Sequence, residues 1–128
     1  MGATMGAAGV TRVVVIDDEE RTVQVLASWL GNLGYVVHGF TSAENAIDFV
    51  SREGADVVLT ASHVADMGGA QIAASMRHAR RACPPAFVAM TPAGESSKVE
   101  PGFDAIVRKP CALDTLLNEI SRLCPAHS

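Results

Sequence analysis

The chain has 128 residues, of which 48% are hydrophobic, so it is long enough for one domain with a real core and too short for two ordinary domains. This hydrophobic content argues against a disordered chain, and the net charge of -4 argues against nonspecific nucleic-acid binding, which needs a basic surface. No apolar run approaches the length that spans a membrane.

The two ends of the chain indicate where the domain begins and ends, and its cysteines indicate a reducing compartment. Residues 1–9 are small and lack the basic region of a secretory signal, so we expect a flexible leader, a domain over residues 10–125 and a tail at 126–128. Cys83, Cys111 and Cys124 are odd in number, which fits reduced thiols in the cytoplasm. A zinc site built from them is disfavoured, because the chain has no CxxC or HxxxH pair.

The first predicted element is a strand that runs directly into four carboxylates. Residues 12–16 are mainly β-branched and apolar, as expected of a strand buried on both faces, and Asp17, Asp18, Glu19 and Glu20 follow. Like charges resist sharing a site unless a cation compensates them, so one hypothesis is an acidic, cation-binding pocket at the end of the strand. The alternative is that the acids only begin the next helix, where the macrodipole favours negative charge.

Helical and strand-like segments alternate along the rest of the chain. Thr41 to Glu44 has the form of a capping box, and Gly34 and Gly54 stand where two helices are expected to end. Apolar residues that recur every three or four positions predict four helices: Val23, Leu26, Leu30 and Leu33; Ala43, Ala46, Ile47 and Val50; Ile72, Ala73 and Met76; Leu113, Leu116, Leu117, Ile120 and Leu123. Further strands are expected over residues 36–40, 56–60, 86–91 and 103–107, so the pattern predicts a parallel sheet covered on both faces.

Three features fall at the ends of predicted strands: Asp17-Asp18 after the first, Thr91 at the end of the fourth, and Lys109-Pro110 after the fifth. Together with the order of elements, they closely resemble the receiver domain of two-component response regulators, over about residues 12–124. Supporting marks are Gly34-Tyr35, Met67 and Gly69. The resemblance implies a flavodoxin-like, doubly wound α/β fold with five parallel strands in the order 2-1-3-4-5.

The resemblance also implies a chemistry, in which a histidine kinase donates a phosphoryl group to an Asp at the end of the third strand. Asp18, with Asp17 through water, would hold Mg²⁺, which prefers carboxylate oxygen. The Lys109 ammonium would neutralise charge on the phosphoryl group, and the Thr91 hydroxyl would donate a hydrogen bond to it. A cis bond before Pro110 would aim Lys109 into the crevice. Each residue alone also has a purely structural explanation, and their joint placement favours the functional one.

The sequence departs from the family at the acceptor. Alignment of residues 56–60 on the third strand puts Ala61 at the acceptor position, and a methyl group cannot be phosphorylated. Mg²⁺ would retain at most one direct carboxylate and the His63 backbone carbonyl, so binding should be weak. Asp66 lies past the strand end and is a poor substitute, Ala65 replaces the loop proline, and Ile106 replaces the switch aromatic. The segment over residues 92–102 has room for about two helical turns at most.

Three functional hypotheses follow. In the first, the chain is a cytoplasmic pseudo-receiver that is not an enzyme, contacts no nucleic acid or membrane, and binds a histidine kinase, a phosphotransfer protein or a downstream regulator. In the second, it is a normal Mg-dependent receiver whose acceptor Asp was replaced by Ala61. Native degeneration is favoured, since Ile106 and Ala65 are further losses; Lys109 could then pair with Asp17 or Asp18. The third, a flavodoxin-like cofactor binder, is disfavoured because the acids after the first strand would repel phosphate.

Overall fold

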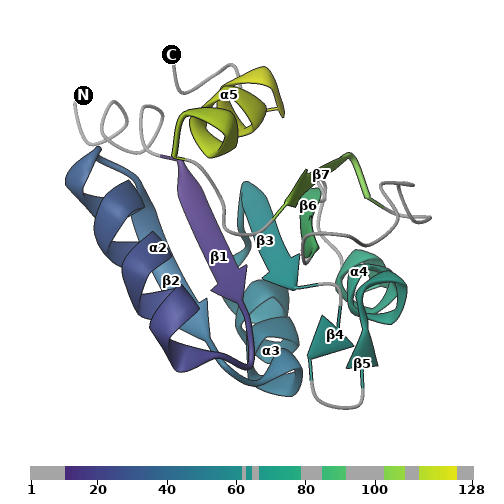
Figure 1. Cartoon of the computed structure of the whole chain (residues 1–128). Coiled ribbons are helices and arrows are strands. Elements are labelled where there is room, and N and C mark those ends of the chain that lie inside the picture. The colour runs from purple at the N-terminus through teal and green to yellow at the C-terminus, as the bar shows by residue number, and fades with distance from the viewer. Residues whose placement is uncertain are drawn as a thin grey trace, which may run out of the picture.

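The computed structural model describes residues 11–61, 63–64, 67–78, 85–91, 103–108 and 113–123. Five parallel strands form one sheet in the order β2-β1-β3-β6-β7 (Figure 1), which confirms the predicted 2-1-3-4-5 arrangement. The strands of this sheet are β1 (Arg12–Ile16), β2 (Val36–Phe40), β3 (Val57–Ala61), β6 (Ala86–Thr91) and β7 (Ala105–Arg108). The helices are α2 (Glu20–Asn32), α3 (Ala43–Glu53), α4 (Gly69–His78) and α5 (Leu113–Leu123).

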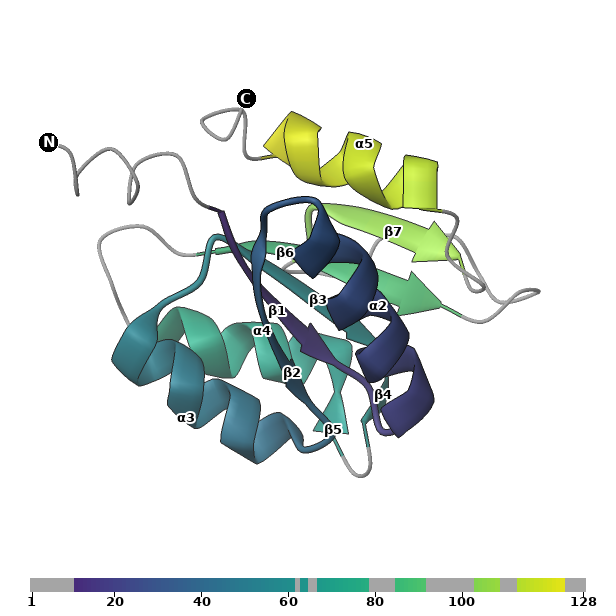
Figure 2. The same ribbon diagram turned by 90° about the vertical axis from the view of Figure 1, so that its left-hand side faces the viewer.

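Two apolar layers cover the sheet, because successive residues of a strand point to opposite faces. Val13 and Val15 join the cluster that α2 and α5 complete, whereas Val14 and Ile16 join the cluster that α3 and α4 complete. All four of these side chains are fully buried. Figure 2 shows the two pairs of helices on opposite sides of the sheet. The uninterrupted apolar run of β1 is therefore explained by burial on both faces.

Helix α2 ends where Gly34 was expected to end it. Gly34 adopts φ +98°, which favours glycine, and its N–H donates to the Gly31 carbonyl at 3.1 Å. The prediction that Leu33 belongs to the inner stripe of the helix was wrong, because Leu33 is the C-cap and is 48% exposed. The backbone leaves the helical conformation at Leu33, so the Leu33 side chain does not lie on the helix face that buries Val23 and Leu26.

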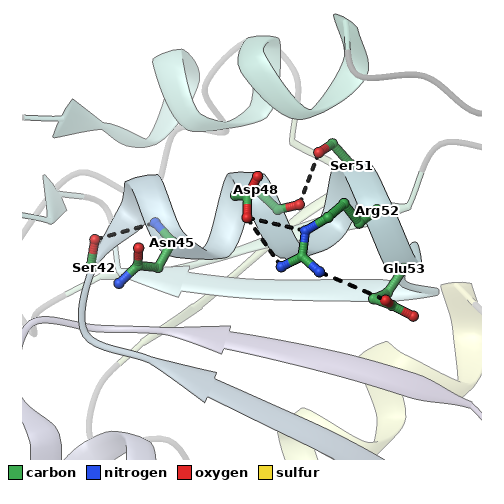
Figure 3. Close-up of polar contacts among 6 residues, drawn as sticks. All are labelled: Ser42, Asn45, Asp48, Ser51, Arg52 and Glu53. Atoms are coloured by element: carbon green, nitrogen blue, oxygen red, sulfur yellow. Dashed lines mark hydrogen bonds and ion pairs between the residues drawn. The ribbon is translucent and has the colours of Figure 1, made fainter.

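Helix α3 begins at Ala43, one residue later than a capping box with Thr41 as its N-cap would place it. Ser42, not Thr41, is the N-cap, and its hydroxyl accepts the Asn45 N–H at 3.3 Å. Both neighbouring residues carry a hydroxyl, so the sequence pattern did not separate them. Figure 3 shows this cap on the same helix as the ion pair between Arg52 and Asp48, in which nitrogen and oxygen are 3.1 Å apart.

A short antiparallel hairpin precedes α4 and was not predicted. It consists of β4 (His63–Val64) and β5 (Met67–Gly68), and each strand is too short to show a periodic pattern. No helix within the described ranges is long and apolar enough to cross a membrane. Several predictions lie outside the described residues: those for Lys109, Pro110, Ala65, Asp66, the three cysteines, the leader, the tail and residues 92–102.

Two aspartates fix the starts of β3 and β7 by the same arrangement. Asp56 donates its N–H to the Arg12 carbonyl at 2.9 Å, and its carboxylate accepts the Arg12 N–H at 2.7 Å. Asp104 donates to the Phe87 carbonyl at 2.8 Å and accepts the Phe87 N–H at 2.9 Å. Each carboxylate thus accepts a backbone N–H of the neighbouring strand, as a backbone carbonyl does within the sheet. The two strands start one and two residues later than predicted, immediately after these aspartates.

Candidate functional site

The register of the sheet brings the predicted site residues to one edge. Asp17 directly follows β1, Ala61 ends β3 and Thr91 ends β6, all at the carboxyl ends of neighbouring parallel strands. Adjacent strands lie about 4.8 Å apart, so these positions form a compact row. Lys109 comes next after β7 in the chain but lies outside the described residues. The aligned pairs are Ile16 with Thr60, Ala61 with Met90, and Thr91 with Arg108.

The two aspartates after β1 occupy different environments. Asp17 is 1% exposed, its Oδ1 accepts the Glu19 N–H at 2.9 Å, and its own N–H donates to the Phe40 carbonyl at 3.1 Å. Asp18 is exposed. The first acid therefore helps to shape the start of α2, while the second stands in solvent at the edge of the sheet. The contact of Asp17 with the Glu19 N–H agrees with the interpretation that the acids begin the next helix, and the cation-binding interpretation stays a prediction.

Ala61 closes β3 with a methyl group where the family resemblance expects a carboxylate. It is 6% exposed and belongs to the apolar cluster on the α3 and α4 side of the sheet. The preceding residue, Thr60, is fully buried, and its hydroxyl donates to the Ala61 carbonyl at 3.0 Å. The role of Thr60 was not predicted, because the sequence offers only a hydroxyl in an otherwise apolar strand. The hydroxyl contact constrains the backbone at position 61.

Thr91 presents a buried hydroxyl at the end of β6. The residue is 7% exposed, and its Oγ1 has no hydrogen-bond partner within the part of the chain that the structure describes. A buried polar group without a partner costs about 1–3 kcal/mol, so its retention calls for an explanation. A hydroxyl at this strand end is able to donate to an oxygen of a ligand bound beyond the sheet, as the resemblance implies.

The oxygen donors at this edge fit a tightly bound divalent cation poorly. Across the described ranges, no group of three or more His, Cys, Asp or Glu residues is placed to hold a metal ion. Asp17 and Asp18 remain, with the backbone of His63, which lies in β4 opposite Gly68. Mg²⁺ requires a nearly octahedral set of oxygens, and Ala61 supplies none from its side chain. No chemical step is therefore assigned to a metal.

Ile106 lies on β7 at the position of the expected switch aromatic. It pairs with Ala89 of β6, is half-buried, and packs against the apolar cluster on the α3 and α4 side. An aliphatic side chain at this place adds to the core. It has no ring whose inward or outward position would report on Thr91.

Comparison with known proteins decides the family. The model of the response regulator receiver domain matches residues 13–121, most of the chain. The chain belongs to this family. The sensor histidine kinase RcsC of Salmonella typhimurium is 27% identical over 106 residues, and RcsC of Escherichia coli is 26% identical over 106 residues. Each match covers 81% of this chain and 11% of the relative, so the chain spans about a tenth of these curated relatives.

Solved structures show the same fold. A CheY-like response regulator receiver domain from Methylobacillus flagellatus superposes with a TM-score of 0.79 at 19% identity, covering 89% of this chain and 98% of that one. The Saccharomyces cerevisiae receiver domain of Ssk1, solved in complex with the histidine phosphotransfer protein Ypd1, gives 0.79 at 16% identity and 92% coverage of both chains. This receiver domain therefore has the CheY-like, flavodoxin-like α/β fold predicted from the sequence. Receiver domains are generally non-enzymatic modules of two-component signalling.

Proposed function

We propose that this chain is a pseudo-receiver, which signals through protein contacts without accepting a phosphoryl group. One observation carries the proposal: the residue that ends β3 at the carboxyl edge of the sheet is Ala61. Stable phosphorylation of a receiver needs a carboxylate oxygen as nucleophile, and a methyl group has no lone pair to offer. The protein would act in the cytoplasm and would not be an enzyme.

Two further features support this proposal. Ile106 packs into the core and lacks the ring that would couple the pocket to the surface. The loss of a carboxylate at position 61 also weakens any Mg²⁺ site that Asp17 and Asp18 form, so metal binding is expected to be weak. The partners we propose are a histidine kinase, a phosphotransfer protein or a downstream regulator. No direct contact with nucleic acid or membrane is part of the proposal.

A second candidate function, phosphoryl acceptance, is favoured by the residues that the pocket retains. Asp17 and Thr91 lie at the ends of β1 and β6, the two strands that flank β3, and the Thr91 hydroxyl is buried without a partner among the described residues. A natural protein with Asp at position 61 would be a normal Mg-dependent, phosphoryl-accepting receiver. In that case Ala61 would be the single lesion in a competent site.

Intact mass spectrometry separates the two functions. The chain as written and its Ala61→Asp variant are each incubated with Mg²⁺ and acetyl phosphate, and the gain of one phosphoryl group is measured. Labelling of the variant alone means that Asp17, Asp18, Thr91 and Lys109 form a competent pocket with one lesion. Labelling of neither protein means that the pocket has decayed and that the domain works by binding. Labelling of the chain as written would overturn the proposal, because the acceptor would not be at position 61.

A further inference from the structure

Strand β2 is the last strand on one side of the sheet, and part of its backbone points away from the sheet. Within the described ranges β1 is its one neighbouring strand (Figure 2). The Val36 N–H and the Phe40 carbonyl hydrogen-bond to the residues that precede and follow β1, at 3.0 and 3.1 Å, so the backbone of both residues points toward β1. Backbone groups of successive strand residues point alternately to the two sides. The N–H and carbonyl groups of Val37 and Gly39 therefore point outward.

This outer side of β2 lacks the features that commonly keep a terminal strand from pairing with another chain. Such strands are often protected by charged residues, by proline or by a bulge. The sequence of β2 is Val-Val-His-Gly-Phe, without Asp, Glu, Lys, Arg or Pro, and it pairs with β1 in unbroken register. Val36 is 38% exposed, and Gly39 is exposed as well. At the opposite end of the sheet, by contrast, β7 ends at Arg108.

The outward backbone groups of β2 are arranged so that the strand can pair with a second copy of itself. Val37 and Gly39 are the second and fourth of its five residues, so they lie symmetrically about the third, His38. A two-fold axis through His38 places Val37 of one copy opposite Gly39 of the other, twice. In antiparallel strands each such pair exchanges two hydrogen bonds. Any other two-fold register leaves part of β2 opposite residues outside the strand.

The side chains of β2 also fit this register. Val37 lies on the α2 side, where it would face a glycine, so no side chain opposes it. On the α3 side, the exposed Val36 would lie opposite Phe40, which packs against the cluster of α3 and α4. Pairs of β-branched and aromatic residues directly opposite each other stabilise antiparallel strands. A charged strand would find no opposite charge on β2, whereas a second β2 is equally uncharged.

We propose that two copies of this chain pair through β2, antiparallel about a two-fold axis at His38, and form one continuous sheet. With five paired residues on each side, the contact is smaller than a standard interface of about 20–30 residues a side. The expected dissociation constant is therefore weak, between about 10 μM and 1 mM. The inference goes beyond the proposed function, because the pairing needs neither a phosphoryl group nor a different protein.

The axis brings the two His38 side chains face to face. Opposed residues that exchange no hydrogen bonds have Cα atoms about 4.5 Å apart. The ring of Phe49 in α3 lies 4.5 Å from the His38 ring, and the charged groups that act on His38 are Arg12 of β1 and Glu53 of α3. Protonation would place two imidazolium groups opposite each other and near two guanidinium groups, which the Glu53 carboxylates offset only in part. Acid should therefore dissociate the pair.

Sedimentation equilibrium of the full chain, from about 5 μM to 1 mM, measures the association. We expect a dimer near about pH 7.5 whose dissociation constant rises at least about tenfold by about pH 5.5, and His38→Gln should remove this dependence on pH. Val36→Lys places a charge at the contact and should weaken the dimer at least about tenfold. Val25→Lys is the matched control, because Val25 of α2 is 39% exposed and lies outside β2, so it should change nothing. Far-UV circular dichroism verifies that each variant is folded.

Disulfide cross-linking tests the position of the axis. His38→Cys should form an intermolecular disulfide on mild oxidation, since a Cα separation of about 4.5 Å lies within the range that a disulfide spans. Val36→Cys is the control, because the two copies of Val36 would be four residues apart along the strands, about 13 Å, which is too far. Peptide mapping by mass spectrometry separates this bond from any that the three native cysteines form.

Several results would overturn the inference. One is a chain that remains monomeric up to about 1 mM. Another is a dimer that folded Val36→Lys leaves intact or that Val25→Lys dissociates, because the contact would then lie on another surface. Cross-linking of Val36→Cys as readily as His38→Cys would exclude the axis at His38. None of these results depends on phosphoryl uptake, which decides the proposed function.

Discussion

Gly39 in β2 has no room for an added methyl group. A Cβ there would lie 2.3 Å from Cγ1 of Val23, a core residue of α2. Ordinary carbon–carbon contacts are about 3.5–4.0 Å, so more than 1 Å of movement is needed. Val23 cannot supply it by rotation, because a β-branched side chain in a helix has essentially one χ1 rotamer. Helix α2 or strand β2 must shift instead.

The magnitude follows from two opposing terms. Overpacking of a well-packed core destabilises the fold by about 1–3 kcal/mol. Replacement of a strand glycine by Ala stabilises it by about 0.5–1 kcal/mol, because Gly loses more backbone entropy on folding. We therefore expect Gly39→Ala to lower the free energy of unfolding by about 1–2 kcal/mol. Urea denaturation measures this, with the fluorescence of Trp29, the single tryptophan, as the signal.

Two further variants test the cause. Gly31→Ala in α2 is the matched control: its Cβ would meet nothing within 4 Å, so the same substitution should stabilise by up to about 1 kcal/mol. Val23→Ala removes the atom that Gly39→Ala would strike, so the double variant should lose less stability than the sum of the two single variants. Additive losses, or an unchanged stability for Gly39→Ala, would refute the argument from close approach.

Three other predictions concern stability. Ser42→Ala should lower the free energy of unfolding by about 1 kcal/mol through loss of the α3 cap, and Ser42→Asp should retain it, both by urea titration. Asp104→Ala should cost about 1–2 kcal/mol because the Phe87 N–H loses its acceptor, whereas Asp104→Asn should restore most of that loss; equal losses would exclude the hydrogen bond as the cause. Burial, and then the Arg12 guanidinium, lower the pKa of His38 below 6.5, so the unfolded chain binds more protons. Stability should therefore fall as pH drops from about 6.5 through the folded pKa, and His38→Gln should flatten that slope in denaturation curves at several pH values.

The sequence predicted the sheet well because β1, β3 and β6 are buried on both faces and read as apolar runs, whereas the edge strand β2 is exposed or half-buried along its length. It predicted the inner residues of α2 and α3 from their spacing, and Val23 and Val50 are buried as expected. One error arose where two neighbouring residues offer the same chemistry, and another where the chain leaves a helix. Thr41 and Ser42 both carry a hydroxyl, and only the backbone path decides which one caps α3. Leu33 continues the apolar spacing, yet the turn at Gly34 removes it from the helix.

The sequence predicted which strand ends carry the site residues, but not the burial and hydrogen bonds of those residues. Asp17, Ala61 and Thr91 could be assigned to strand ends because each follows or ends a clear apolar run. The sequence does not reveal that Asp17 is buried while Asp18 is exposed, because the two adjacent acids have the same chemistry and differ only in the direction in which the backbone points them. Thr60 was missed because its hydroxyl donates to the carbonyl of the next residue, and a single hydroxyl in an apolar strand does not predict that local contact.

The aspartate at the start of β3 has a consequence for how the strands find each other. In most strands the alternation of apolar and polar side chains specifies the pairing register. A strand buried on both faces lacks this alternation, because a one-residue slip of β1 replaces one apolar side chain by another, such as Val14 by Val15. Asp56 removes this ambiguity. Its N–H and carboxylate together meet the backbone of Arg12, and no one-residue slip preserves both bonds. The Asp56 carboxylate thus fixes the register of β1 against β3 at the centre of the sheet. Strands that pair out of register during folding lack these two hydrogen bonds and separate more readily.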